Sequence, residues 1–224
     1  MGRTVSARPV RAVARGSVAA LLIAALHASA SLGAPRGGSA PARFESSRAL
    51  SARLARGGSA RARIERRDVD PLSGEMRIQR ARVVLQPPDR VRIEFPGEGE
   101  TIALRSDGGE WLQPQLGQML RIGAESLAPA LRWWEMLLPS GAGRFEERAL
   151  APRRWAVTRR GGGAADTAWV DLGTDGLPAR LAYRDAAGER IEIVFRGWTF
   201  GPKLPASRFR LVAPPGVETV DLHY

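Results

Sequence analysis

The sequence predicts a mainly β protein of the α+β class, with an antiparallel sheet of about nine to eleven strands and a small number of helices. Three observations predict this fold. Between residues 59 and 211, apolar and polar residues alternate with a period of two, which gives a strand one buried and one exposed face. Stretches rich in glycine, proline and aspartate separate the alternating runs. Only two segments after the N-terminal 42 residues follow helical spacing instead.

The N-terminus has the features of a secretory signal peptide. Four arginines precede an apolar run at residues 18–26, and small residues follow it. The run is about half as long as the ~20 residues of a membrane-spanning helix, which favours a cleaved signal over an anchor. We expect cleavage after Ala30 or Ala34. Residues 1–34 are then signal peptide and short leader, and residues 35–224 form a single periplasmic domain.

The composition argues against an enzyme. The chain has no cysteine, and its two histidines are His27, within the predicted signal, and His223, beside the C-terminus. The sequence therefore excludes disulfides, thiolate sites and lipid attachment at a cysteine. It also excludes catalysis that depends on histidine. Two close glutamate pairs, Glu98/Glu100 and Glu189/Glu192, are typical of solvated strand edges. We expect no catalytic residue, no metal and no cofactor.

The chain is strongly basic, with a formal net charge of +11. Lys203 is the only lysine, and arginines occur in every segment without an arginine-rich block. This scatter favours a compositional bias over a nucleic-acid-binding surface, and an exported protein has no nucleic acid partner. A modest attraction to anionic phospholipid head groups remains a secondary possibility.

After the leader, a short helix is expected over residues 43–56. Phe44, Leu50 and Leu54 form its apolar side, and it ends near Gly57 and Gly58. The strands follow from here. Their predicted apolar faces are Ala60/Ala62/Ile64, Met76/Ile78, Val83/Leu85, Val91/Ile93/Phe95, Ile102/Leu104, Leu181/Tyr183, Ile191/Ile193/Phe195 and Phe209/Leu211. The predicted turns are DPLSG, PPD, PGEG, SDGG, GTDG, DAAGE and PPG.

The stretch SLAPALRWWEMLLPSG, residues 126–141, predicts a second helix over residues 126–138. Ser126 is a suitable N-cap, and Leu138 ends the helix because the residue before a proline avoids the helical region. Its apolar residues cover an arc of roughly 220°, about twice what packing on one sheet needs. Either a second helix, such as 43–56, supplies the other contact, or the helix is a lid over a cavity.

The order of the motifs resembles the LolA family of periplasmic lipoprotein carriers and its broader superfamily, which includes the RseB-type regulators. The matching elements are a proline-aspartate-basic step into a strand at residues 88–92, an SDG hairpin at 106–108, and an F-x-L-x-x-P-x-G-V ending at 209–217. The resemblance covers nearly the whole chain after the signal peptide.

This resemblance implies a strongly curved antiparallel sheet that forms an incomplete barrel, with helices covering its concave face. It also implies a monomeric carrier that holds lipoprotein acyl chains in an apolar cavity. Such a carrier takes a lipoprotein from an inner-membrane lipoprotein-releasing transporter and passes it to an outer-membrane acceptor. On this reading, the cavity floor is formed by Val91, Ile93, Phe95, Ile102 and Leu104, and the lid by Leu127, Leu131, Trp134 and Leu138.

The sequence departs from the family at one functional position. Proteobacterial LolA proteins have an arginine before the proline of this strand, where it bonds to the lid, and the corresponding residue here is Pro87, preceded by Gln86. An aromatic residue common in the family is replaced by Ile93. Three alternatives therefore stay open: a carrier of another lipid or hydrophobic small molecule, an RseB-like sensor of lipoproteins, and a structural envelope protein with a filled interior.

Overall fold

The computed structural model describes residues 45–70, 73–124, 133–141, 143–162, 166–184 and 188–222. These residues form one large sheet with a ten-residue helix, short 3-10 helices and an α-helical turn at residues 133–135. The helices are α1 (Arg48–Gly57), η2 (Pro114–Leu116), η3 (Pro139–Gly141) and η5 (Ala206–Phe209). The strands are β1 (Ser59–Val69), β2 (Met76–Gln86), β3 (Arg90–Phe95), β4 (Glu100–Arg105), β5 (Gly108–Gln113), β6 (Gln118–Gly123), β7 (Phe145–Ala151), β8 (Arg154–Arg159), β9 (Thr167–Leu172), β10 (Pro178–Arg184), β11 (Arg190–Gly201) and β12 (Glu218–Leu222).

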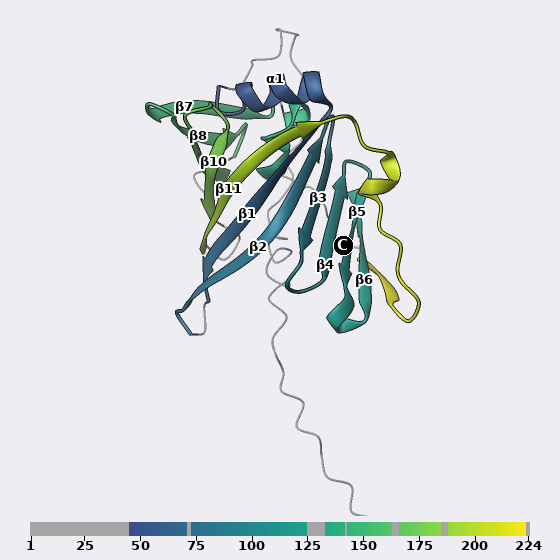
Figure 1. The fold of residues 1–224 in the computed structure, drawn as a ribbon. Coiled ribbons are helices and arrows are strands. Elements are labelled where there is room, and N and C mark those ends of the chain that lie inside the picture. The colour runs from purple at the N-terminus through teal and green to yellow at the C-terminus, as the bar shows by residue number, and fades with distance from the viewer. Residues whose placement is uncertain are drawn as a thin grey trace, which may run out of the picture.

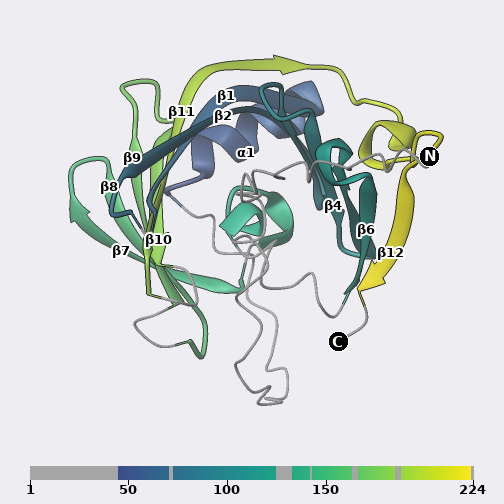
Figure 2. The ribbon, with the colours of Figure 1, turned by 90° about the horizontal axis from the view of Figure 1, so that it is seen from below.

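Within these ranges the twelve strands have the order β12-β6-β5-β4-β3-β2-β1-β11-β10-β9-β8-β7. All neighbours are antiparallel except β12, which runs parallel to β6. The two edge strands, β7 and β12, are not paired with each other in the described structure, and the sheet curves around a central helical segment without closing (Figure 2). The predicted fold, a strongly curved antiparallel sheet that forms an incomplete barrel, is confirmed.

The alternating residues of the strands divide the sheet into a concave and a convex face. On β1, Ala60, Ala62 and Ile64 are buried while the arginines between them are exposed. The register pairs Ala62 with Val83 of β2, so the buried faces of neighbouring strands coincide. The resulting core is one apolar cluster on the concave side, which explains why a period of two located these strands.

Strand β2 contains two predicted apolar pairs that face opposite sides. Val83 and Leu85 are fully buried on the concave face, whereas Met76 and Ile78 are 60% and 53% exposed on the convex face. The prediction that Met76 and Ile78 form a buried face is therefore wrong. Ile78 and Val83 are five positions apart, and side chains an odd number of positions apart point to opposite faces of a strand.

The predicted strand at Phe209/Leu211 is also wrong. Phe209 lies in η5, where its side chain is fully buried outside the concave cluster, and Leu211 lies in irregular structure. Helix η5 packs on β3 and β4 and does not pair with either of them as a strand. The strand count of twelve exceeds the predicted range partly because β7 is mostly exposed and shows little apolar alternation.

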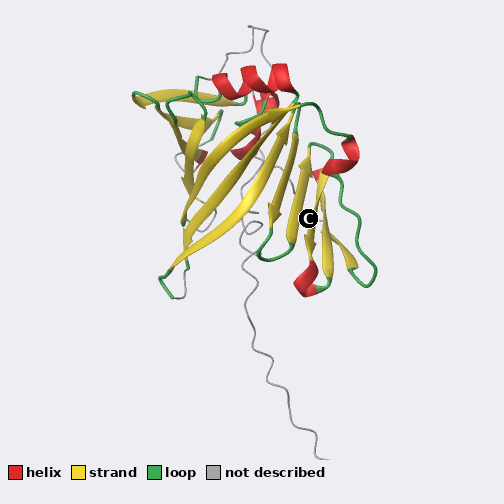
Figure 3. Cartoon of the chain, in the orientation of Figure 1, coloured by secondary structure: helices red, strands yellow, loops and turns green. Residues whose placement is uncertain are grey.

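Helix α1 lies across one end of the sheet (Figures 1 and 3) and buries Leu50 and Leu54 in the concave cluster. It ends as predicted, because Gly58 adopts a positive φ of 92° and its N–H bonds the Leu54 carbonyl at 2.8 Å. At its start, the Glu147 carboxylate of β7 accepts the Ser46 hydroxyl. Phe44 lies outside the described residues. Among the helices described, none has the length and apolar character needed to cross a membrane.

Candidate functional site

The five predicted floor residues lie side by side on the concave face of β3 and β4. Val91 pairs with Leu104 and Ile93 pairs with Ile102 in the antiparallel register, and Phe95 follows at the end of β3. All five are at most 6% exposed. One apolar cluster joins them to the concave residues of β1, β2, β10 and β11. The structure thus brings the predicted floor together, and its contact with a ligand stays a prediction.

Two of the four predicted lid residues can be placed. Leu127 and Leu131 lie outside the described residues, whereas Trp134 and Leu138 are buried in the same cluster as the floor. We call residues 133–141 the lid segment. Its α-helical part ends at Glu135 rather than at Leu138 as predicted, because the chain tightens here into turns with Leu138 N–H bonding the Glu135 carbonyl at 2.9 Å.

A glycine allows the lid segment to end this way. Gly141 in η3 is folded back so closely that a Cβ there would overlap the Glu135 carbonyl oxygen. The sequence LPSG therefore stops the helix through both the proline at its end and the close approach that only glycine permits.

The tryptophans of the lid segment rest on aromatic residues that sequence reasoning did not assign to the site. Trp133 packs against Tyr183 of β10 with ring centroids 5.3 Å apart, and Trp134 meets Phe195 of β11 edge-on at 6.4 Å. Phe195 in turn stacks on Trp198 at 5.3 Å. Alternation placed Tyr183 and Phe195 on strands, but nothing in the sequence indicates which segment they face.

The curvature of the sheet accounts for part of the wide apolar arc. Figure 2 shows the teal-green helical turn of the lid segment at the centre of the curve, with strands around it. Five of its residues are at most 7% exposed: Trp133, Trp134, Met136, Leu137 and Leu138. A segment inside a curved sheet meets apolar surface on more than one side, so a second helix is not required.

The lid segment is attached mainly through apolar contacts. Its backbone hydrogen bonds within the described ranges are local, such as Leu137 to Trp134 and Gly141 to Leu138. Glu135 pairs with Arg144 at 2.9 Å, and the Arg144 side chain is 60% exposed. Apolar contacts have no fixed direction and can be replaced by those of another apolar group.

The concave face becomes polar toward the β1–β2 hairpin. Arg66 and Asp68 follow Ile64 on the same face of β1 and form an ion pair at 3.5 Å, and both are buried. Gln79 of β2 donates to Glu98 at 3.0 Å. The apolar floor is therefore bounded at this end by polar side chains.

Glu100 is a buried carboxylate beside the floor, and its Oε2 accepts the Trp111 indole N–H at 3.0 Å. Burial raises the pKa of Glu100 above its usual range; the Trp111 hydrogen bond lowers it in part, and the charge of Glu98 raises it further. Because the folded pKa lies above the unfolded one, the protein loses stability as pH rises through the folded pKa.

We therefore expect Glu100→Gln to raise the melting temperature by a few degrees at mildly alkaline pH and to leave it nearly unchanged at pH values below the unfolded pKa of about 4.3. Thermal unfolding across this pH range measures the difference. Glu218→Gln, at an exposed position on β12, is the control. A stability gain that is the same at both ends of the range would contradict the assignment.

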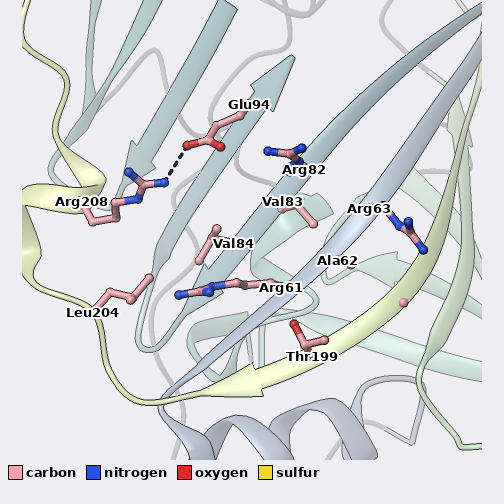
Figure 4. A pocket seen from close by; sticks show the side chains of 11 residues that line it. Arg61, Ala62, Arg63, Arg82, Val83, Val84, Glu94, Thr199, Leu204 and Arg208 are labelled. Carbon is pink, nitrogen blue, oxygen red and sulfur yellow. Dashed lines mark hydrogen bonds and ion pairs between the residues drawn. The ribbon is translucent and has the colours of Figure 1, made fainter. Parts of the chain in front are cut away.

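The described residues also line two pockets away from the predicted site. Both open on the convex face, have volumes of about 360 and 530 Å³, and include arginines of β1 and β2 in their linings (Figure 4 shows the first). None of the nine predicted site residues lines either pocket. Sequence reasoning missed this surface because it treated the arginines as scattered.

The part of the chain that the structure describes holds no group of three or more histidine, aspartate or glutamate side chains that could bind a metal ion. The expected absence of a metal, a cofactor and catalytic activity stays a prediction.

No protein-family model matches this sequence, and no curated protein matches it. Among solved structures, the chain is similar to an uncharacterized conserved protein from Thermus thermophilus, at 15% identity and a TM-score of 0.45, over 76% of this chain and 96% of that one. A LolA superfamily protein from Nitrosomonas europaea is similar at 9% identity and a TM-score of 0.40, over 74% and 97%. The LolA superfamily is among the structural neighbours.

The lipoprotein LppX from Mycobacterium tuberculosis is a further neighbour, at 15% identity and a TM-score of 0.35, over 75% of this chain and 98% of that one. At these identities and TM-scores the likeness concerns the fold alone.

The end of β2 is tied to the segment after β11. Gln86, which precedes Pro87, is fully buried. The side-chain amide of Gln86 donates to the Leu204 carbonyl at 3.3 Å and its oxygen accepts the Leu204 N–H at 2.7 Å. Gln86 therefore holds the segment after β11 in place.

Proposed function

We propose that this protein is a periplasmic carrier that binds the acyl chains of lipoproteins and shuttles them from the inner to the outer membrane. One observation carries the proposal: a continuous apolar surface covers the concave face of an unclosed sheet, and the lid segment over it is held by apolar and aromatic contacts. The donor would be an inner-membrane lipoprotein-releasing transporter, and the receiver an outer-membrane acceptor.

The floor residues are packed in this structure, so a ligand enters only if the lid segment moves. An acyl chain would then take over the contacts that Trp134 and Leu138 make with the cluster. Because one apolar group replaces another, the exchange exposes little apolar surface to water. The polar end of the concave face, around Arg66 and Glu100, offers a place for the polar part of the cargo.

The energetics of delivery favour a carrier without catalytic residues. Moving ~30 methylenes from water into an apolar cavity is worth roughly 25 kcal/mol, at about 0.8 kcal/mol each. Such binding is reversible only when the donor and acceptor are also apolar, so that the chain passes between similar environments. No covalent bond changes, and the side chains required are apolar ones on a segment that can move.

We expect acylated lipoprotein or another acyl lipid to co-purify with the exported protein in roughly equimolar amount, because one apolar cluster joins the floor and the lid segment on the concave face. Native mass spectrometry followed by lipid extraction measures the mass and stoichiometry. A hydrophobic fluorescent probe should bind the delipidated protein and be displaced by an acylated peptide. Absence of both bound lipid and probe binding would overturn the proposal.

A further inference from the structure

Three arginines lie in one row across the convex face. The register pairs Arg63 of β1 with Arg82 of β2 on one side and with Arg196 of β11 on the other. All three side chains point away from the concave core and are exposed. Neighbouring strands lie about 4.8 Å apart, so the row brings three positive charges within roughly 10 Å. Like charges directly opposite each other destabilise a sheet.

Carboxylates among the described residues neutralise the positive charge of these three arginines only weakly. No hydrogen bond or ion pair joins Arg63 or Arg82 to a carboxylate there, and the same holds for Arg61 nearby. Arg196 reaches Glu65 at 3.8 Å, a distance too long for a good hydrogen bond. The row therefore keeps a positive charge that an external anion could balance.

The local backbone opens a pocket along this row. The pairing of β1 with β11 shifts between Arg61 and Arg63, at a bulge where Gly197 has a positive φ of 64°. Gly197 carries no side chain where the Arg63 guanidinium lies close to the strand, and any Cβ there would touch it. The bulge and the glycine thus leave space beside Arg63 on the convex face.

The segment after β11 forms the opposite wall of the pocket. Leu204, held by Gln86, and Arg208 of η5 both line it (Figure 4). Arg208 pairs with Glu94 at 3.0 Å, and Glu94 is also bonded by Arg92 at 2.7 Å. Glu94 also lies opposite Arg82 in the register, so this one carboxylate faces three arginines and leaves a net positive charge.

We propose that this convex surface, formed by Arg61, Arg63, Arg80, Arg82, Arg196 and Arg208, docks the protein on anionic phospholipid head groups of a membrane surface. These residues line the two adjoining pockets, and the carboxylates that line them are Glu65 and Glu94. A guanidinium group can donate two parallel hydrogen bonds to two oxygens of one phosphate. A charged surface spread over β11, β1 and β2 fits an array of head groups better than it fits one small anion.

The test compares vesicle binding of the exported protein and of Arg63→Gln/Arg82→Gln/Arg196→Gln. The wild type should sediment with vesicles of phosphatidylglycerol and phosphatidylcholine at low ionic strength, and not with phosphatidylcholine alone. Each arginine near an anionic membrane contributes about fivefold to binding, so the variant should bind roughly a hundredfold more weakly. High salt should release the wild type. Because the exchanged side chains are exposed, the melting temperature should not fall.

The matched control is Arg121→Gln/Arg148→Gln/Arg159→Gln, which removes the same charge from exposed positions on β6, β7 and β8. It should retain most of the binding. An equal loss in both variants would show that net charge alone attracts the protein and would overturn the proposal. Stabilisation by inorganic phosphate without any vesicle binding would also overturn it, since the surface would then be a site for a free anion.

Discussion

Replacing Trp134 by glutamate is expected to lower the affinity for a hydrophobic probe or an acylated peptide at least about tenfold while the sheet stays folded. Trp134 is 5% exposed and contacts Phe195, but it belongs to a segment attached mainly by apolar contacts. A carboxylate in a packed apolar site costs several kcal/mol. The lid segment can avoid that cost by lifting into water, and it then no longer encloses a ligand.

Probe affinity and melting temperature should be measured on the same Trp134→Glu sample, with Trp134→Phe as the conservative variant. Leu181→Glu is the matched core variant, because Leu181 is fully buried in the middle of β10 and cannot move away from the sheet. It should unfold the domain. If Trp134→Glu lowers the melting temperature as much as Leu181→Glu does, residues 133–141 are core and the interior is filled, as in a structural protein.

Arg105→Ala is expected to destabilise the protein by about 3–5 kcal/mol, which is roughly 10 °C in melting temperature. Arg105 is 8% exposed at the end of β4 and forms a bidentate salt bridge with Glu110, with nitrogen–oxygen distances of 2.7 and 2.8 Å. It also donates to the carbonyl of Phe209 at 2.6 Å. Removing the guanidinium leaves the half-buried Glu110 carboxylate and the Phe209 carbonyl without these hydrogen-bond donors.

The same substitution should loosen the segment after β11, because Arg105 holds η5 against the convex face. Hydrogen exchange at residues 204–211 reports that loosening separately from global unfolding. Arg154→Ala is the control: Arg154 bonds Asp171 at 2.6 Å, but its side chain is 51% exposed, so its loss should change the melting temperature little. Equal losses for the two variants would refute the role given to Arg105.

Local patterns in the sequence were enough for most of the fold. The alternation at Ala60, Ala62 and Ile64 set which side of β1 is buried, and the predicted turns PPD, PGEG and GTDG each lie between two strands. Gly57 and Gly58 ended α1 where expected, since a positive φ at a helix end favours glycine. These features depend on residues a few positions apart, so they can be read from the chain directly.

Only part of the candidate site could be predicted from local patterns in the sequence. Alternation and family resemblance predicted a floor whose five residues lie together on β3 and β4, and the apolar arc predicted Trp134 as a lid residue; their contact with a ligand stays a prediction. The aromatic residues under the lid segment, Tyr183 and Phe195, could not be assigned, because they follow Trp134 by 49 and 61 positions. No local pattern specifies which faces meet across such a separation.

By itself, then, the sequence determined most of the strands and their buried sides, several turns and the C-terminal end of α1, because backbone preferences and hydrophobic periodicity act over a few residues. The tertiary structure alone decided that Arg63 lies between Arg82 and Arg196, that Met76 faces outward, and that Phe209 is buried in a short helix rather than in a strand. Each of these depends on strand register or on the path of a distant segment. Those are decided by the packing of the whole sheet, because shifting a strand by one residue would turn every side chain to the other face.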